Sequence, residues 1–84
     1  MTESEYLEKL AQTEQDLYFI RQRIKKLGFE IAEAERQKDV AEANKKRRFL
    51  RQQERYSTYT KCYRKTLNSQ YQSMLKGVRN DVQA

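Results

Sequence analysis

The chain has no histidine, no proline and no tryptophan among its 84 residues, and only one cysteine and two glycines. Without histidine, the commonest general base of enzymes is missing, and no zinc site of the His/Cys type can form. The sequence also lacks a glycine-rich phosphate loop and a serine nucleophile elbow. We therefore expect a protein that is not an enzyme and that holds no cofactor and no metal ion.

A long apolar run is missing as well. No segment approaches the roughly 18 apolar residues that span a bilayer. The first residues, MTESEYLEKL, do not have the basic and apolar regions of a secretory signal. The single Cys62 cannot form an internal disulfide, which is typical of a reducing compartment. These features predict a cytoplasmic protein, or a nuclear one in a eukaryote, that does not associate with membranes.

Helix-forming residues make up most of the chain. Proline and glycine interrupt helices most strongly, and their scarcity leaves long stretches free to be helical. Eighty-four residues form at most one domain, here residues 1–84. A core of this size gives little stability unless the chain self-associates or docks on a larger protein. We therefore expect a single all-α domain that oligomerises or binds a partner.

Apolar residues recur at alternating spacings of three and four along the first half of the chain, as in a coiled coil. Thr2 stands three residues before Glu5, the spacing of a capping box, and predicts the start of this helix. The periodic positions are Tyr6, Leu10, Thr13, Leu17, Ile20, Ile24, Leu27, Ile31, Ala34 and Ala41. They predict a helix over residues 3–42 with one apolar face.

The pattern then changes phase. A second set of positions begins at Phe49 and continues through Gln53, Tyr56, Thr60, Tyr63, Leu67, Tyr71, Met74 or Leu75, and Val78. Two structures fit: one long helix with a stutter in its repeat, or an antiparallel, coiled-coil-like helical hairpin. We favour the hairpin, with a turn over residues 42–46 at Asn44 and a second helix over residues 46–81. It would pack into a four-helix bundle or onto a partner.

The hairpin predicts a seam between the two helices. Its expected members are Tyr6, Leu10, Leu17, Ile20, Ile24, Leu27, Ile31, Leu67, Tyr71 and Val78. A turn at Asn44 would place Tyr6 beside Val82 and Leu17 beside Tyr71.

Charge is unevenly distributed. The whole chain carries +6, but residues 1–20 carry −4 and residues 36–65 carry +8. The basic segment over residues 45–55 is followed directly by tyrosines. The candidate contact residues for a partner are Lys45, Lys46, Arg47, Arg48, Arg51, Arg55, Tyr56, Tyr59 and Tyr63.

Three functions fit these features. The first is a non-catalytic adaptor or regulator, including an inhibitor, that binds a protein with an acidic or apolar surface or self-associates. The second is a nucleic-acid-binding protein, in which the basic segment neutralises phosphates and the tyrosines stack on bases. The third is a structural coiled-coil scaffold. We favour the first, because Arg and Tyr are enriched at the centres of protein interfaces.

Overall fold

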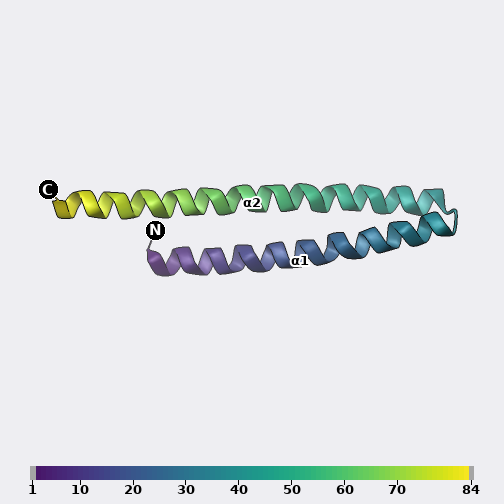
Figure 1. Ribbon diagram of the computed structural model, residues 1–84, viewed down its shortest axis with the longest axis horizontal. Helices are drawn as coiled ribbons and strands as arrows, with labels where there is room; N and C mark the ends of the chain where they lie inside the picture. Colours follow the sequence, from purple (N-terminus) through teal and green to yellow (C-terminus); the bar gives the residue numbers. More distant parts are fainter. Residues whose placement is uncertain (1, 84) are drawn as a thin grey trace.

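The protein is a hairpin of two long antiparallel helices (Figure 1). The computed structural model describes the backbone of residues 2–83 and the side chains of residues 2–77. Helix α1 spans Glu3–Arg36 and α2 spans Val40–Gln83, and the described residues contain no strand. The expected all-α helical hairpin is therefore confirmed.

The two helices are joined by a very short turn. Lys38 has a positive φ of 59°, and its N–H donates to the carbonyl of Glu35 at 3.0 Å. The N–H of Asp39 donates to the carbonyl of Ala34 at 2.9 Å. These two bonds close α1 in a Schellman motif. The Asp39 carboxylate then accepts from the N–H of Glu42 at 3.1 Å, so Asp39 caps the start of α2.

The turn thus lies at residues 37–39, and the expected turn over residues 42–46 is wrong. Asn44 is inside α2, where its Oδ1 accepts from Arg47 at 2.9 Å. The expectation rested on Asn44 being the residue of that region that tolerates a left-handed conformation most readily. Lys38 adopts that conformation instead. Asp39 and Glu42 repeat the three-residue spacing of Thr2 and Glu5, where Thr2 Oγ1 accepts from the N–H of Glu5 at 3.1 Å, and this signal marks the true start of α2.

Helix α1 buries one continuous stripe. Its members are buried or half-buried at every expected position from the start of the helix to its last turn: Tyr6, Leu10, Thr13, Leu17, Ile20, Ile24, Leu27, Ile31 and Ala34. Ala41, the last expected member, is exposed in the first turn of α2 because α1 has already ended.

Helix α2 buries a stripe that is largely polar. Its members are Ala43, Lys46, Leu50, Gln53, Ser57, Thr60, Arg64, Leu67, Tyr71 and Met74. The expected members among them are Gln53, Thr60, Leu67, Tyr71 and Met74. Phe49, Tyr56 and Tyr63 were expected in the same stripe, but all three are exposed. Thr60 satisfies its hydroxyl within its own helix, donating to the carbonyl of Tyr56 at 2.7 Å.

The short turn explains this choice of phase. The first pair of facing residues beyond it is Ala34 and Ala43, which are 6% and 2% exposed. Only small side chains fit where two helices have just separated from a three-residue connection. Once Ala43 faces α1, the 3.6-residue period carries Leu50, Ser57 and Arg64 into the seam. It leaves the aromatic residues to one side.

The register of the two helices follows from two contacts. The Tyr6 and Tyr71 rings stack with centroids 4.1 Å apart. Arg64 Nη1 lies 2.8 Å from Glu14 Oε1. Tyr6 was expected beside Val82, and Leu17 beside Tyr71. Tyr6 contacts Tyr71 instead, eleven residues earlier, so both pairings are wrong by about twice the displacement of the turn. The side chain of Val78, an expected seam member, lies outside the described residues. Helix α2 is longer than α1 and extends past its start (Figure 1).

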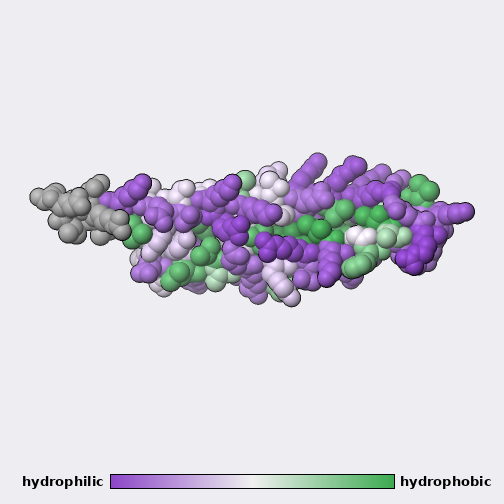
Figure 2. Space-filling model, viewed as in Figure 1, coloured by the Kyte–Doolittle hydropathy of each residue, from purple (hydrophilic) through white to green (hydrophobic). Residues whose placement is uncertain are grey.

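The hydrophobic core is thin. Five hydrophobic residues of the described part are buried: Leu17, Ile20, Ala34, Ala43 and Leu67. The Cα radius of gyration is 19.5 Å, against about 12 Å for a compact domain of this length. The space-filling view shows a narrow hydrophobic band between hydrophilic margins (Figure 2). Little of the molecule is far from solvent.

Candidate binding surfaces

The basic segment of residues 45–55 is divided between the inside and the outside of the hairpin. Lys46 lies in the seam, with its Nζ 2.9 Å from Glu30 Oε2 and 3.7 Å from Glu42 Oε1. Arg47 pairs with Glu35 of α1. These two cations hold the helices together near the turn, so their charge is already neutralised within the chain.

The contact between Lys46 and Glu30 changes the acidity of both groups. The hydrogen bond from the Lys46 ammonium lowers the pKa of Glu30. The same bond raises the pKa of Lys46, and desolvation opposes the shift in each case. Both side chains are part exposed, so water screens the pair. Such a part-exposed pair adds little to stability.

Arg48, Arg51 and Arg55 point outward and form what we call the arginine ridge. All three are exposed, and their spacing of three and four places them on one line along α2. Within residues 2–77, no acidic side chain makes an ion pair with any of them. Shallow open grooves border the ridge, one lined by Phe49 and Gln52 and another by Glu54, Thr58 and Tyr59. Lys45 is also exposed near its start.

A second surface runs beside the seam on α2 and carries no charge. We call it the uncharged strip. Its members follow the three-four spacing: Phe49, Gln52, Tyr56, Tyr59, Tyr63, Thr66, Gln70 and Ser73. All eight are exposed, and Tyr59 is 68% exposed. Gln52 Nε2 donates to the hydroxyl of Tyr56 at 3.1 Å, which links neighbouring members along the strip. In a chain that is 36% charged, such a strip is a distinct surface.

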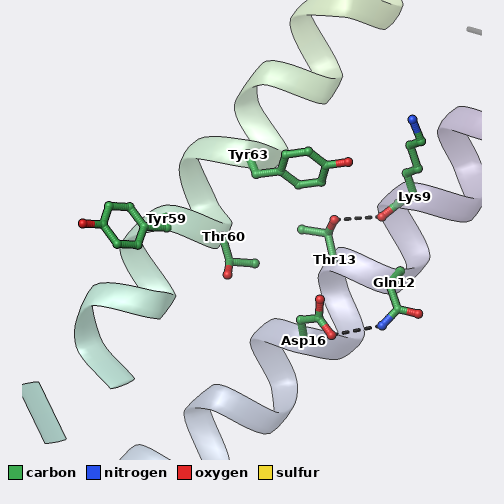
Figure 3. Close-up of a pocket in the computed structure, with 7 residues that line it drawn as sticks. All are labelled: Lys9, Gln12, Thr13, Asp16, Tyr59, Thr60 and Tyr63. Carbon is green, nitrogen blue, oxygen red and sulfur yellow. Dashed lines mark hydrogen bonds between the residues drawn. The ribbon is translucent and has the colours of Figure 1, made fainter. Parts of the chain in front are cut away.

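The strip borders a groove of about 330 Å³ between the two helices. Thr13, Thr60 and Tyr63 line it together with Lys9, Gln12 and Asp16 of α1. Tyr63 extends toward α1, whereas Tyr59 points away from it (Figure 3). Gln12 donates to Asp16 at 3.0 Å on the α1 side. The strip and the outer edge of α1 therefore belong to one face of the hairpin.

The α1 edge of this face is charged. Its members continue the spacing of Lys9, Gln12 and Asp16 through Phe19, Arg23, Lys26, Glu30 and Glu33. Phe19 is 47% exposed. One face of the molecule thus combines an uncharged aromatic half on α2 with a half of mixed charge on α1.

The nine residues that the sequence offered as partner contacts do not lie on one surface. The nine candidate contact residues fall into three sets: those paired across the seam, those of the arginine ridge with Lys45, and the tyrosines of the uncharged strip. Phe49 and Phe19 belong to the exposed aromatic surface but were not among the candidates. The signal for Phe49 was its seven-residue spacing from Tyr56 and Tyr63.

Other kinds of site find no support in the described part of the chain. It contains no group of three or more His, Cys, Asp and Glu side chains arranged to hold a metal ion. Neither α1 nor α2, over those same residues, has a stretch long and apolar enough to cross a membrane. Comparison with known protein families, curated proteins and solved structures found no match to this chain.

Proposed function

We propose that the protein is a non-catalytic helical adaptor or regulator that binds a protein partner with an acidic surface through its arginine ridge. One observation carries the proposal: Arg48, Arg51 and Arg55 are exposed and have no acidic partner among the described residues, whereas Lys46 and Arg47 are paired internally. A ridge of free guanidinium groups is suited to carboxylates, since each group can donate two parallel hydrogen bonds.

Several features support binding over catalysis. The chain has no histidine, and its grooves are shallow and open rather than pockets that exclude water. Cys62 is exposed and unbridged, which fits a reducing cytoplasm. A small protein bound to an acidic surface of its partner blocks that surface to other molecules. The proposal therefore includes inhibition of a partner as well as bridging two partners.

The proposal is tested by removing the ridge charge alone. Arg48, Arg51 and Arg55 are changed together to glutamine. The matched control changes Lys61, Lys65 and Lys76 together to glutamine. These are three exposed basic residues farther along α2, so the control lowers the net charge equally. Tagged forms are used to capture partners from the source cells after nuclease treatment. We expect a partner that the control retains and the ridge variant loses. Equal capture by both variants would refute the proposal.

A nucleic-acid partner is the second candidate, and one contact favours it. Tyr59 lines the same groove as Arg51 and Arg55. Arginines can bind successive phosphates while an exposed tyrosine stacks on a base, worth about 1–3 kcal/mol per base. This function predicts nuclease-sensitive capture. It also predicts that affinity for a single-stranded oligonucleotide falls with salt at a logarithmic slope of about −0.7 per phosphate contact. Tyr59→Ala should weaken that binding without changing helicity.

A further inference from the structure

The hairpin exposes more surface than a compact monomer of its mass. Its accessible area is 6752 Å² for 10.2 kDa, whereas folded monomers of this mass expose about 5300 Å². The excess comes with exposed aromatic residues, of which Phe49, Tyr56 and Tyr63 are between 44% and 47% exposed. A standard interface covers about 800 Å² on each partner. The Cα atoms of the hairpin extend over 69 × 16 × 12 Å, so one broad face is large enough for such an interface.

We propose that this face binds a second copy of the chain. The two hairpins would pack face to face and antiparallel, about a two-fold axis that passes beside Tyr56. The result would be a four-helix bundle in which α2 packs against α2 and α1 against α1. This inference goes beyond the proposed function and does not depend on what the arginine ridge binds.

The uncharged strip is suited to facing itself. A two-fold interface brings the same patch of both copies together, so any charge near the axis would meet its own kind. In the antiparallel arrangement, Tyr56 meets Tyr56 of the second copy, and Phe49 meets Tyr63 of the second copy. Farther out, Lys45 faces the neutral Thr66 of the second copy. Aromatic residues would thus meet at the centre without any charge being buried among them.

The charges on α1 provide an independent argument. The residue numbers of three facing pairs, Glu30 with Lys46, Tyr6 with Tyr71 and Glu14 with Arg64, add up to 76, 77 and 78. Tyr56 therefore lies level with Arg21. The axis that passes beside Tyr56 also crosses α1 near that residue. This places Asp16 against Lys26 of the second copy.

The same register pairs the remaining charges of the α1 edge. Lys9 faces Glu33 of the second copy, so opposite charges meet again toward both ends. Arg23 faces the exposed Phe19 ring of the second copy, an arrangement that allows a cation–π contact. A shift of the axis by one or two residues keeps the signs complementary, because Lys9 then meets Glu30 and Asp16 meets Arg23. Complementary charge of this kind fixes orientation and register at interfaces.

The parallel arrangement of the same two faces does not fit. It would place α2 against α1 of the second copy, so that Tyr63 met Asp16 and Phe49 met the region of Lys26 and Glu30. Charges would then be desolvated against aromatic rings without a paired partner, which is costly. The antiparallel arrangement also leaves both arginine ridges on the outside, along the same edge of the bundle. Dimerisation and ridge binding are therefore compatible.

The test is a charge swap that only an intermolecular contact can rescue. Asp16 and Lys26 are ten residues apart on one helix, about 15 Å, and do not contact each other within a chain. Asp16→Lys would set two like-charge contacts in each dimer and should raise the dimer Kd on the order of tenfold. The double variant Asp16→Lys, Lys26→Asp restores opposite charges and should return the Kd to within about threefold. Sedimentation equilibrium measures the Kd, and circular dichroism verifies that helicity is unchanged.

The centre of the interface is tested separately. Tyr56→Asp places two carboxylates against each other on the axis and should give a monomer. The control, Thr58→Asp, adds the same charge two residues away on the opposite side of α2 and should remain a dimer of about twice 10.2 kDa. A wild-type chain that is monomeric at about 100 µM, far above the Kd of standard-size interfaces, would overturn the inference. So would a charge swap that fails to recover the dimer. The ridge variant separates this inference from the proposed function. If it loses the captured partner but remains a dimer, ridge binding and dimerisation are independent properties.

Discussion

Gln53 is the weakest point of the seam, and replacing it should make the hairpin more stable. Its side chain is half-buried on the inner face of α2. Its Oε1 is fully buried and has no hydrogen-bond partner among the described residues. Leucine has a similar volume, lacks the unsatisfied oxygen and continues the apolar contacts of Leu50 along the seam. Gln53→Leu therefore removes a penalty and adds burial at once.

The magnitude follows from the buried oxygen. An unsatisfied polar group inside a protein costs about 1–3 kcal/mol, so the variant should gain stability of that order. For a chain of 84 residues, each kcal/mol corresponds to a rise in Tm of about 4–8 °C. Urea unfolding followed by circular dichroism should show a higher midpoint at an unchanged slope, with all samples at one protein concentration because self-association adds to apparent stability.

The matched control is Gln22→Leu, because Gln22 is exposed on the outer face of α1. It makes the same chemical change where no oxygen is buried, and should alter the free energy of unfolding by less than about 0.5 kcal/mol. An unchanged or lower midpoint for Gln53→Leu would show that the carboxamide is satisfied by water or by a shifted rotamer. An equal gain in both variants would mean that the effect comes from helix propensity alone.

Three further predictions concern the turn, the ion pair beside it and the core. Asp39→Ala removes the cap of α2 and should lower the free energy of unfolding by about 0.5–2 kcal/mol. Asn44→Ala, inside the helix, should be neutral or slightly stabilising. The urea midpoints of the two variants distinguish the observed turn from one at residues 42–46. Lys46 lowers the pKa of Glu30 from 4.5. The stability that this ion pair provides is therefore present above pH 4.5 and is lost as the pH falls through the folded-state pKa of Glu30. Glu30→Gln should therefore flatten the acid limb of a stability–pH profile, and an unchanged limb would contradict this role. Leu17→Ala, at a side chain that is 0% exposed, should cost about 2–5 kcal/mol and leave most of the chain unfolded at 25 °C by circular dichroism.

The composition and the three-four spacing were sufficient to predict the fold class and the stripe of α1. Every position from Tyr6 to Ala34 follows one period, and a helix can bury such a stripe in only one way. Thr2 and Glu5 were likewise sufficient for the start of α1, because a cap depends on residues that are adjacent in the sequence.

The phase of α2 could not be predicted in the same way, because its sequence offers two overlapping stripes. Gln53, Thr60 and Leu67 belong to both. One stripe adds the aromatic Phe49, Tyr56 and Tyr63, and by hydrophobicity alone it should be the buried one. The other adds Leu50, Ser57 and Arg64.

The tertiary structure decided between these stripes through the turn. Asp39 starts α2 three residues after α1 ends, and Ala34 then has to meet Ala43 because nothing larger fits so close to the turn. That one contact rotates α2 so that Ser57 and Arg64 face inward while the aromatic residues face solvent. The sequence by itself determined which faces of each helix were apolar. Only packing at the turn determined which of them the hairpin covers and which remains available to a partner.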